Sequence, residues 1–448
     1  MANIVFVLAP SMGSLNSSLK LAKMLKANGH QVSYVGLADS EEYVLKNGVE
    51  FKKIYEKWFP KGFGAKQALL PVTASSENDV LRAGVSREQA FLEAILNEDT
   101  EFPRVIETLR PDLILHIHAD PLMVVLALQS YALGINAAYL RDMLGRSKHS
   151  EIPPIWTGII PSESIYSRLC IQLAWHKNSV LRTYSTLYSR FLASVDFNGM
   201  IKKLAKKSGY PWALVDKEGL PPYILKLPEV VLCPKEFDFP HSDKPGRYYT
   251  EASIDIERNE VSFAWDALDE TRPLVYCALG TLAWLPTEHY RAFYQAVIDA
   301  ACSCPGFQWI LAVGDFIYPQ DFTNIPSNAI IVHRAPQLQM LKRSRMMITH
   351  GGTNTIKECI YFGVPMVVFP LGYDHPGNAA RVIYHGLGVK GDFLKVTKEQ
   401  VRALVDTINL DSGYVRRVQL MQSKFQEAEN AQLSLKMIEA LLQKRSLS

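Results

Sequence analysis

The segment 350–358, His-Gly-Gly-Thr-Asn-Thr-Ile-Lys-Glu, carries the densest set of side chains that could do chemistry. It follows an apolar run, and its glycine pair predicts a tight turn that leads into a helix. The first turn of such a helix has unpaired N–H groups and a partial positive charge, which suits the diphosphate of a nucleotide. The segment therefore predicts an anion-binding loop between a strand and a helix.

Two polar residues of this helix extend the predicted site. Asn354 and Glu358 are four residues apart and so share one helix face. Asn354 can donate a hydrogen bond to a phosphate, and Glu358 can accept from the two hydroxyls of a ribose. A solvated polar face is the alternative for Glu358 alone, but it explains the His-Gly-Gly-Thr-Asn run poorly.

Asp374 and His375 follow the next apolar run, which ends near Pro370. Ligands of open α/β folds bind at the carboxyl ends of the strands, so both residues would reach the edge that holds the segment 350–358. There they could hydrogen-bond the hydroxyls of a sugar. Each residue alone also has a simpler interpretation: Asp374 as a turn residue and His375 as a surface histidine.

Strand-like and helix-like segments alternate along most of the chain. Near-continuous apolar strands between helices, such as 3–9, 112–119 and 274–280, predict parallel sheets covered on both faces. A polar, turn-rich stretch at 235–272 interrupts the alternation and predicts a linker. We therefore expect an α/β fold of two facing, doubly wound domains and a terminal helix that returns toward the first domain. The expected boundaries are 1–240, 241–425 and 426–448.

The segment 141–225 departs from this alternation and is rich in aromatic residues, among them Trp156, Trp175 and Trp212. One interpretation is a helical insertion that uses its aromatics as core. The other is the wall of a pocket for an apolar molecule. The two interpretations are compatible.

Composition excludes some function classes. The 448 residues carry a net charge of +3, too small to indicate nucleic-acid binding. The one basic run, Lys202, Lys203, Lys206 and Lys207, predicts a solvated helix face, with transient contact with anionic lipid as the alternative. Six scattered cysteines, no evident secretory signal and no sufficiently apolar stretch predict a cytoplasmic protein with reduced thiols. Nothing in the sequence specifies an oligomeric state.

Together these residues resemble the inverting, nucleotide-sugar-dependent glycosyltransferases, a family that includes the UDP-glycosyltransferases and the bacterial macrolide and carotenoid glycosyltransferases. The resemblance spans most of the chain and is strongest over 329–392. It implies the GT-B fold, in which two Rossmann-like domains face each other. The acceptor binds the N-terminal domain and the nucleotide-sugar donor the C-terminal one.

The resemblance also implies roles for individual residues of the donor domain. His350, Gly352, Asn354 and Thr355 would hold the diphosphate, near Gly280 and Thr281, and Glu358 would bind the ribose. Gln337 would reach the nucleoside, and Asp374 the transferred sugar. No metal or other cofactor is expected, because the helix terminus and His350 serve the diphosphate.

Two positions depart from the family pattern. Arg334 stands where many members have a tryptophan that stacks on uracil, although a guanidinium can also stack on a base or pair with a phosphate. His375 stands where glutamine is usual, and in some members that exchange accompanies galactose in place of glucose. Glucose, galactose and a deoxysugar therefore stay open, as do UDP and TDP.

The largest departure concerns the general base. The family reaction is a direct displacement in which a loop histidine, held by an aspartate, takes the proton of the acceptor hydroxyl. Ser14 occupies the histidine position, and Asp120 the aspartate position. A serine hydroxyl has little basicity, and losing general-base catalysis typically costs about 10²–10⁴ in rate.

Three interpretations of the missing base remain. Asp120 could act as the base, directly or through a water resting on Ser14, which is the one we favour. His118, which with His116 would alternate onto the face of Asp120, could act instead, although a hydrogen-bonded core histidine is its more ordinary role. The acceptor could also be acidic enough to need no base.

The sequence thus predicts a hexosyltransferase that moves glucose or galactose from a UDP-sugar to a hydroxyl of an apolar small molecule, such as a natural product. The alternative is a nucleotide-sugar-binding partner protein with little or no transferase activity, an interpretation that Ser14 motivates.

Overall fold

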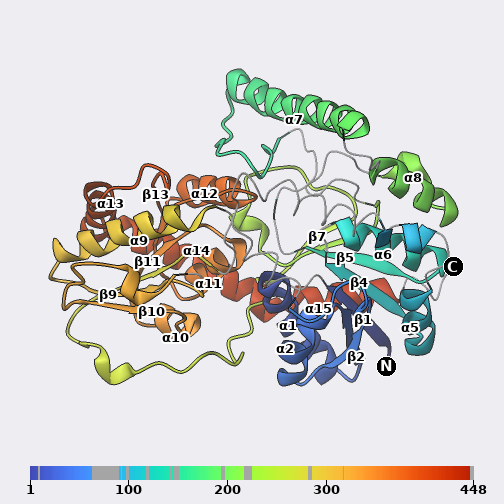
Figure 1. Ribbon diagram of the computed structural model, residues 1–448, viewed down its shortest axis with the longest axis horizontal. Coiled ribbons are helices and arrows are strands. Elements are labelled where there is room, and N and C mark those ends of the chain that lie inside the picture. Colours follow the sequence, from blue (N-terminus) through green and yellow to red (C-terminus); the bar gives the residue numbers. More distant parts are fainter. Residues whose placement is uncertain are drawn as a thin grey trace.

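Two parallel sheets, one in each half of the chain, organise the computed structural model (Figure 1). The structure describes residues 1–8, 11–62, 90–91, 93–96, 100–117, 121–141, 144, 151–192, 197–215, 225–280, 285–315 and 317–443. In Figure 1 the first sheet lies on the right, with β1 to β5 in blue and teal, and the second lies on the left, in yellow and orange.

The first sheet has the strand order β3-β2-β1-β4-β5-β6-β7. Its strands are β1 (Asn3–Leu8), β2 (Gln31–Gly36), β3 (Glu50–Lys53), β4 (Leu113–Ile117), β5 (Ala137–Arg141), β6 (Glu229–Val231) and β7 (Arg247–Tyr249). Its helices in the described residues are α1 (Met12–Ala27), α2 (Glu41–Lys46), α5 (Glu101–Leu109), α6 (Pro121–Ala132), α7 (Ile165–Leu192) and α8 (Phe197–Lys207). β7 lies beyond residue 240, so the first sheet continues past the expected boundary of the first domain, a boundary that itself stays a prediction.

The second sheet has the order β10-β9-β8-β11-β12-β13. Its strands are β8 (Leu274–Ala278), β9 (Gln308–Ala312), β10 (Ala329–Val332), β11 (Ser344–Thr349), β12 (Met366–Val368) and β13 (Gly388–Lys390). Its helices are α9 (Thr287–Cys302), α10 (Gln337–Leu341), α11 (Thr353–Tyr361), α12 (His375–Tyr384), α13 (Lys398–Leu410) and α14 (Gly413–Ala431), and α15 (Leu433–Gln443) ends the described chain.

Strand composition explains both sheets. All residues of β4 and β8 are buried, as expected when helices cover both faces of a parallel sheet. In β1, Ile4, Phe6 and Leu8 enter one core cluster, and Val5 and Val7 enter the cluster on the other face. The period of two places alternate residues on opposite faces. The predicted α/β class with two doubly wound parallel sheets is confirmed.

The terminal helix returns to the first domain, as the sequence predicts. Leu435, Ile438 and Leu441 of α15 pack into the core cluster that contains β1 and α1, and in Figure 1 α15, in red, lies beside α1. The expectation of one continuous helix over the last residues is wrong. Gln432 adopts a left-handed conformation (φ 48°), which separates α14 from α15.

Candidate functional site

The predicted donor residues meet where the strand order of the second sheet reverses. β8 and β11 are neighbours in the sheet, and their connections leave in opposite directions. Gly280 follows β8 and His350 follows β11, so both lie at the carboxyl edge of this switch point. Ligands of open α/β folds bind in such crevices.

Backbone from two loops closes around the His350 imidazole. A Cβ atom on Gly280 would lie 2.7 Å from His350 Cε1, and one on Gly352 would lie 2.6 Å from His350 Nε2. Gly280 also has a φ of +81°, which a side chain rarely tolerates. Glycine is therefore required at both positions by the approach of backbone to the ring.

The surroundings of the His350 ring disfavour its protonated form. Burial, together with the His375 ring whose centroid lies 4.5 Å away, holds the pKa of His350 well below its usual value. Burial lowers the pKa of His375 as well, against the opposing effect of Asp374. A neutral imidazole offers a hydrogen bond to a phosphate oxygen, while Gly352, as N-cap of α11, has no side chain to occupy the first-turn N–H groups.

Asp374 is fixed by the first turns of two helices. Its Oδ2 accepts from Thr353 Oγ1 (2.9 Å) and from Asn378 Nδ2 (2.8 Å). Its Oδ1 lies 3.8 Å from His375 Nε2. The structure thus brings Asp374, His375 and His350 together at one edge, an arrangement that could hold sugar hydroxyls beside a diphosphate.

Glu358 lies one turn further along α11 and is almost fully buried, with 3% of its surface exposed. Its Oε1 accepts from Arg258 Nη1 (2.5 Å) and its Oε2 from Gln337 Nε2 (2.5 Å). Gln337 also lies 3.4 Å from Thr355 Oγ1. Gln337 and Glu358, which were predicted to bind the nucleoside, therefore form one hydrogen-bonded group with Thr355, which was predicted to hold the diphosphate.

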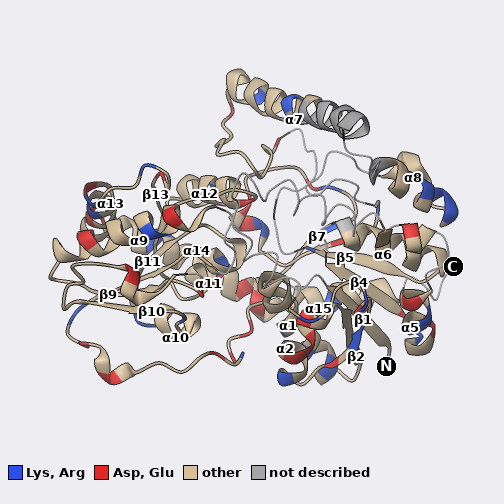
Figure 2. Ribbon diagram, viewed as in Figure 1, with Lys and Arg blue, Asp and Glu red and all other residues tan. Residues whose placement is uncertain are grey.

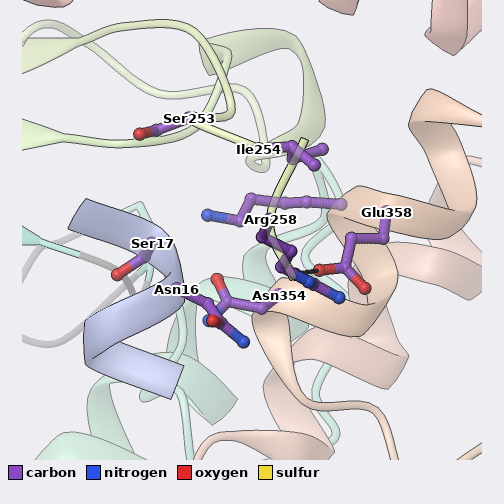
Figure 3. Close-up of a pocket in the computed structure, with 8 residues that line it drawn as sticks. Asn16, Ser17, Ser253, Ile254, Arg258, Asn354 and Glu358 are labelled. Carbon is purple, nitrogen blue, oxygen red and sulfur yellow. Dashed lines mark hydrogen bonds and ion pairs between the residues drawn. The ribbon is translucent and has the colours of Figure 1, made fainter. Parts of the chain in front are cut away.

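Asn354 joins the two domains. Its Nδ2 donates to the carbonyl oxygen of Gly13, in the first turn of α1, over 2.7 Å. Its Oδ1 is buried and has no hydrogen-bond partner in the described part of the chain, and the same holds for Ser253 Oγ. Both residues line a cavity of about 10 Å³, room for roughly one water, together with Asn16, Ser17, Ile254, Arg258, Lys357 and Glu358 (Figure 3).

Ser14 lies in the first turn of α1 and is 1% exposed. Its hydroxyl accepts from Ser11 Oγ (2.8 Å), and its N–H donates to the same atom. His118, Asp120 and Thr281 lie outside the described residues. β4, which leads toward positions 118 and 120, pairs with β1, which leads into α1.

His116 is a core residue. It is fully buried, its Nε2 lies 3.1 Å from Ser130 Oγ, and burial lowers its pKa to about 3. This placement is typical of a hydrogen-bonded core histidine.

Arg334 lies at the rim of the site. Its guanidinium is 63% exposed and pairs with Asp315, which follows the neighbouring strand β9. Among the described residues, no hydrogen bond or ion pair joins this guanidinium to Gln337, Thr355 or Glu358. Arg258 was not predicted from the sequence, because it belongs to a polar stretch interpreted as a linker and carries no motif.

The aromatic segment serves the core where it is described. Trp175 is buried, donates to the Ile152 carbonyl oxygen (3.0 Å) and meets Trp156 edge to face. Trp212 packs against the core cluster of the first domain. The core interpretation is therefore supported for these residues.

The lysine run of α8 faces outward. Figure 2 shows the basic residues of α8 in blue. All four lysine side chains are exposed, whereas Ile201, Leu204 and Ala205 of the same helix are buried. This alternation is typical of a solvated helix face. Among the described helices none is both long and apolar enough to cross a membrane. Nor do three His, Cys, Asp or Glu residues gather as a metal site anywhere in the described ranges.

Known proteins resemble the second half of this chain in sequence and the whole chain in fold. Residues 271–427 match the family "UDP-glucoronosyl and UDP-glucosyl transferase". The NDP-glycosyltransferase YjiC of Bacillus subtilis is 32% identical over 55% of this chain, an alignment that spans 63% of that relative. The oleandomycin glycosyltransferase of Streptomyces antibioticus is 24% identical over 99% of this chain and 92% of its own.

Solved structures agree with the fold over the whole chain. The glycotransferase of kitacinnamycin has a TM-score of 0.66 at 22% identity and covers 98% of both chains. The spinosyn rhamnosyltransferase SpnG, complexed with thymidine diphosphate, has a TM-score of 0.60 at 17% identity and covers 95% of this chain and 96% of its own. These likenesses confirm the predicted GT-B fold. Residues 271–427 thus match the UDP-glycosyltransferase family model, and the chain as a whole has the GT-B arrangement of two Rossmann-like domains.

Proposed function

We propose that this chain transfers a hexose from a UDP-sugar to a hydroxyl of an apolar small-molecule acceptor, with inversion at the anomeric carbon. The observation that carries the proposal is the group at one sheet edge: the α11 N-terminus and neutral His350 for the diphosphate, Glu358 for the ribose and Asp374 for the sugar. The named functions of the relatives support glycosyl transfer.

The proposed reaction is a single displacement. The acceptor oxygen bonds to the anomeric carbon as the bond from that carbon to the phosphate oxygen breaks, and UDP leaves with the bonding electrons. The proton of the acceptor hydroxyl passes to Asp120, with Ser14 as a positioning group. The helix terminus and His350 meet the charge of the leaving diphosphate, so no metal is required.

The proposed location is the cytoplasm. Its support is that all six cysteines are free thiols, which suits a reducing compartment.

The first experiment tests donor binding by thermal shift with UDP, TDP, GDP and ADP. A ligand at about 100 times its Kd adds roughly 2.7 kcal/mol of stability. We expect a shift that favours UDP and that Glu358→Gln reduces, since glutamine keeps the shape of the side chain but not its charge. No shift with any nucleotide would refute the proposal.

The second experiment tests the base. Sugar transfer to a panel of phenolic and alcoholic acceptors is measured in EDTA for wild type, Asp120→Asn and the control Asp112→Asn. Asp112 lies just before the opposite end of β4 and accepts from Asn3 N. We expect Asp120→Asn alone to lose about 10²–10⁴ in kcat.

One observation favours a second candidate, a nucleotide-sugar-binding partner protein. Ser14 is buried and hydrogen-bonded within its own helix turn, so it supplies no base. This candidate predicts UDP-sugar binding without turnover on any acceptor. Steady transfer that Asp120→Asn abolishes would exclude it.

A further inference from the structure

A short strap between the two sheets, residues 251–260, is held by side chains at four points. Glu251 accepts from Ser434 of α15, and Asp255 pairs with Lys23 of α1 (2.6 Å). Arg258 pairs with Glu358 of α11. Glu260 accepts from the N–H groups of Leu338 (3.0 Å) and Gln339 (3.4 Å), at the N-terminus of α10. The strap therefore fixes Arg258 from both sides.

Arg258 holds one carboxylate on each side of its guanidinium. Nη1 lies 2.5 Å from Glu358 Oε1, and Nη2 lies 3.4 Å from Glu260 Oε1. Arg258 and Glu260 are each 9% exposed in their side chains, and Glu358 is 4% exposed. Burial would lower the pKa of Arg258, but the two carboxylates outweigh it and raise that pKa. The guanidinium is thus a permanent, oriented cation beside Glu358 (Figure 3).

The two partners of Glu358 leave it able to bind a diol. A carboxylate has about four lone-pair positions, two on each oxygen. Arg258 takes a position on Oε1 and Gln337 takes one on Oε2. In the described part of the chain no further hydrogen bond reaches either oxygen, so one position remains on each, and both partners fix the carboxylate plane. Two adjacent hydroxyls of a ribose match that pair of acceptors, whereas a 2′-deoxyribose can use only one.

We propose that Arg258 is a positioning residue of the donor site: it holds the Glu358 carboxylate so that both oxygens accept from a ribose, and the site thereby selects ribonucleoside over 2′-deoxyribonucleoside diphosphates. This inference rests on the proposed function, because it assigns the ribose of the donor to Glu358. It also decides between UDP and TDP.

The test compares the Kd of UDP with that of 2′-deoxy-UDP by calorimetry. Wild type should favour UDP by roughly tenfold or more, the value of a hydrogen bond to a charged group. Arg258→Gln should reduce that ratio to about threefold or less, mostly by weakening UDP. Glu358→Gln should reduce it similarly, and the double variant should lose little more than either single one, because both changes remove the same interaction.

The matched control is Arg247→Gln. Arg247 is a buried arginine whose Nε lies 2.7 Å from Glu229 Oε2 in the first domain. Arg247→Gln should lower the free energy of unfolding but keep the wild-type ratio of the Kd of 2′-deoxy-UDP to the Kd of UDP. If Arg258→Gln does not fold, Arg258→Lys replaces it. Lysine keeps the charge but lacks the planar guanidinium with its two parallel donors. The preference of Arg258→Lys for UDP over 2′-deoxy-UDP, measured as the ratio of the two Kd values, should therefore fall at least about threefold.

The outcomes separate the two proposals. Wild type that binds no nucleoside diphosphate overturns both. Wild type that binds UDP without preference over 2′-deoxy-UDP overturns the role of Arg258 alone. Equal losses for both ligands in Arg258→Gln would mean a merely structural role, and tighter UDP binding would mean that Arg258 competes with the ribose. Either result overturns the inference.

Discussion

Gly280 is the residue on which the geometry around His350 depends. Its φ of +81° is one that residues with a side chain rarely adopt, and an added Cβ would lie only 2.7 Å from the His350 ring. We expect Gly280→Ala to lower the free energy of unfolding by about 1–2 kcal/mol through the left-handed backbone and by about 1–3 kcal/mol more through overpacking. UDP affinity should fall as well, because the ring must move. Urea unfolding and calorimetry measure both effects.

Gly314→Ala is the control for Gly280→Ala. Gly314 has nearly the same φ, +82°, but an added Cβ there would meet nothing within 4 Å. This variant should show only the backbone cost and keep wild-type UDP affinity. If the two variants lose equal stability and equal affinity, the approach to His350 is not what requires glycine at position 280.

At the residue scale, spacing along one helix could be predicted and contacts between distant segments could not. The segment 350–358 places Asn354 and Glu358 on one face, because that follows from 3.6 residues per turn. The hydrogen bond from Asn354 to Gly13 crosses 341 positions of sequence, and the pair of Arg258 with Glu358 crosses 100. Such pairs exist only once both domains are packed together.

At the element scale, a buried cluster of polar side chains connects the loop after β6 to α12. Asp238 pairs with Arg381 of α12, with both side chains fully buried. His241 Nδ1 lies 2.7 Å from the Ser242 carbonyl oxygen, and its Nε2 lies 3.0 Å from Tyr249 Oη, which donates to Asp238. Both ring nitrogens thus face acceptors, and this arrangement favours the protonated imidazole.

This arrangement predicts a pH dependence of stability. Burial alone would lower the pKa of His241, but its hydrogen bonds to Asp238 and Ser242 raise that pKa above the usual value of 6.5. The stabilisation is therefore complete below about pH 6.5 and is lost as the pH rises through the raised pKa. The difference in unfolding free energy between wild type and His241→Gln should shrink from pH 5.5 to pH 9. Urea unfolding across that range measures it, and a difference that grows with pH would contradict the arrangement.

Elements with one strong local signal were predicted well. The apolar runs of β4, β8 and β11 are strands because every backbone group of a buried strand finds a partner in the sheet. The break at Gln432 was missed, since glutamine is an ordinary helix former and its left-handed conformation is imposed by where α15 docks. Tertiary packing there overrides local preference.

At the scale of the whole molecule, the end of the chain stabilises its beginning. α14 packs on α11 in the second domain, and α15 packs into the core of the first. Asn136, which precedes β5, donates to the Leu441 carbonyl oxygen, and Lys20 of α1 pairs with Glu429 of α14. The two domains are therefore joined by the consecutive helices α14 and α15 as well as by the strap.

Ile438→Asp tests this connection. Ile438 is fully buried against the first domain, and placing a carboxylate there should cost at least about 3 kcal/mol. The control is Leu433→Asp on the same helix, where the side chain is 38% exposed and the cost should be small. Calorimetric melting with and without UDP measures the result.

In Ile438→Asp the first domain should melt at a lower temperature than the second, giving two transitions. The group that we assign to the donor lies mostly on the second domain, so UDP should raise the second transition and leave the first nearly unchanged. In wild type the packing of α15 couples the domains, and UDP should therefore shift the whole transition. Equal behaviour of Ile438→Asp and Leu433→Asp would mean that α15 does not carry this coupling, and that the strap and Asn354 alone hold α1 against the second domain.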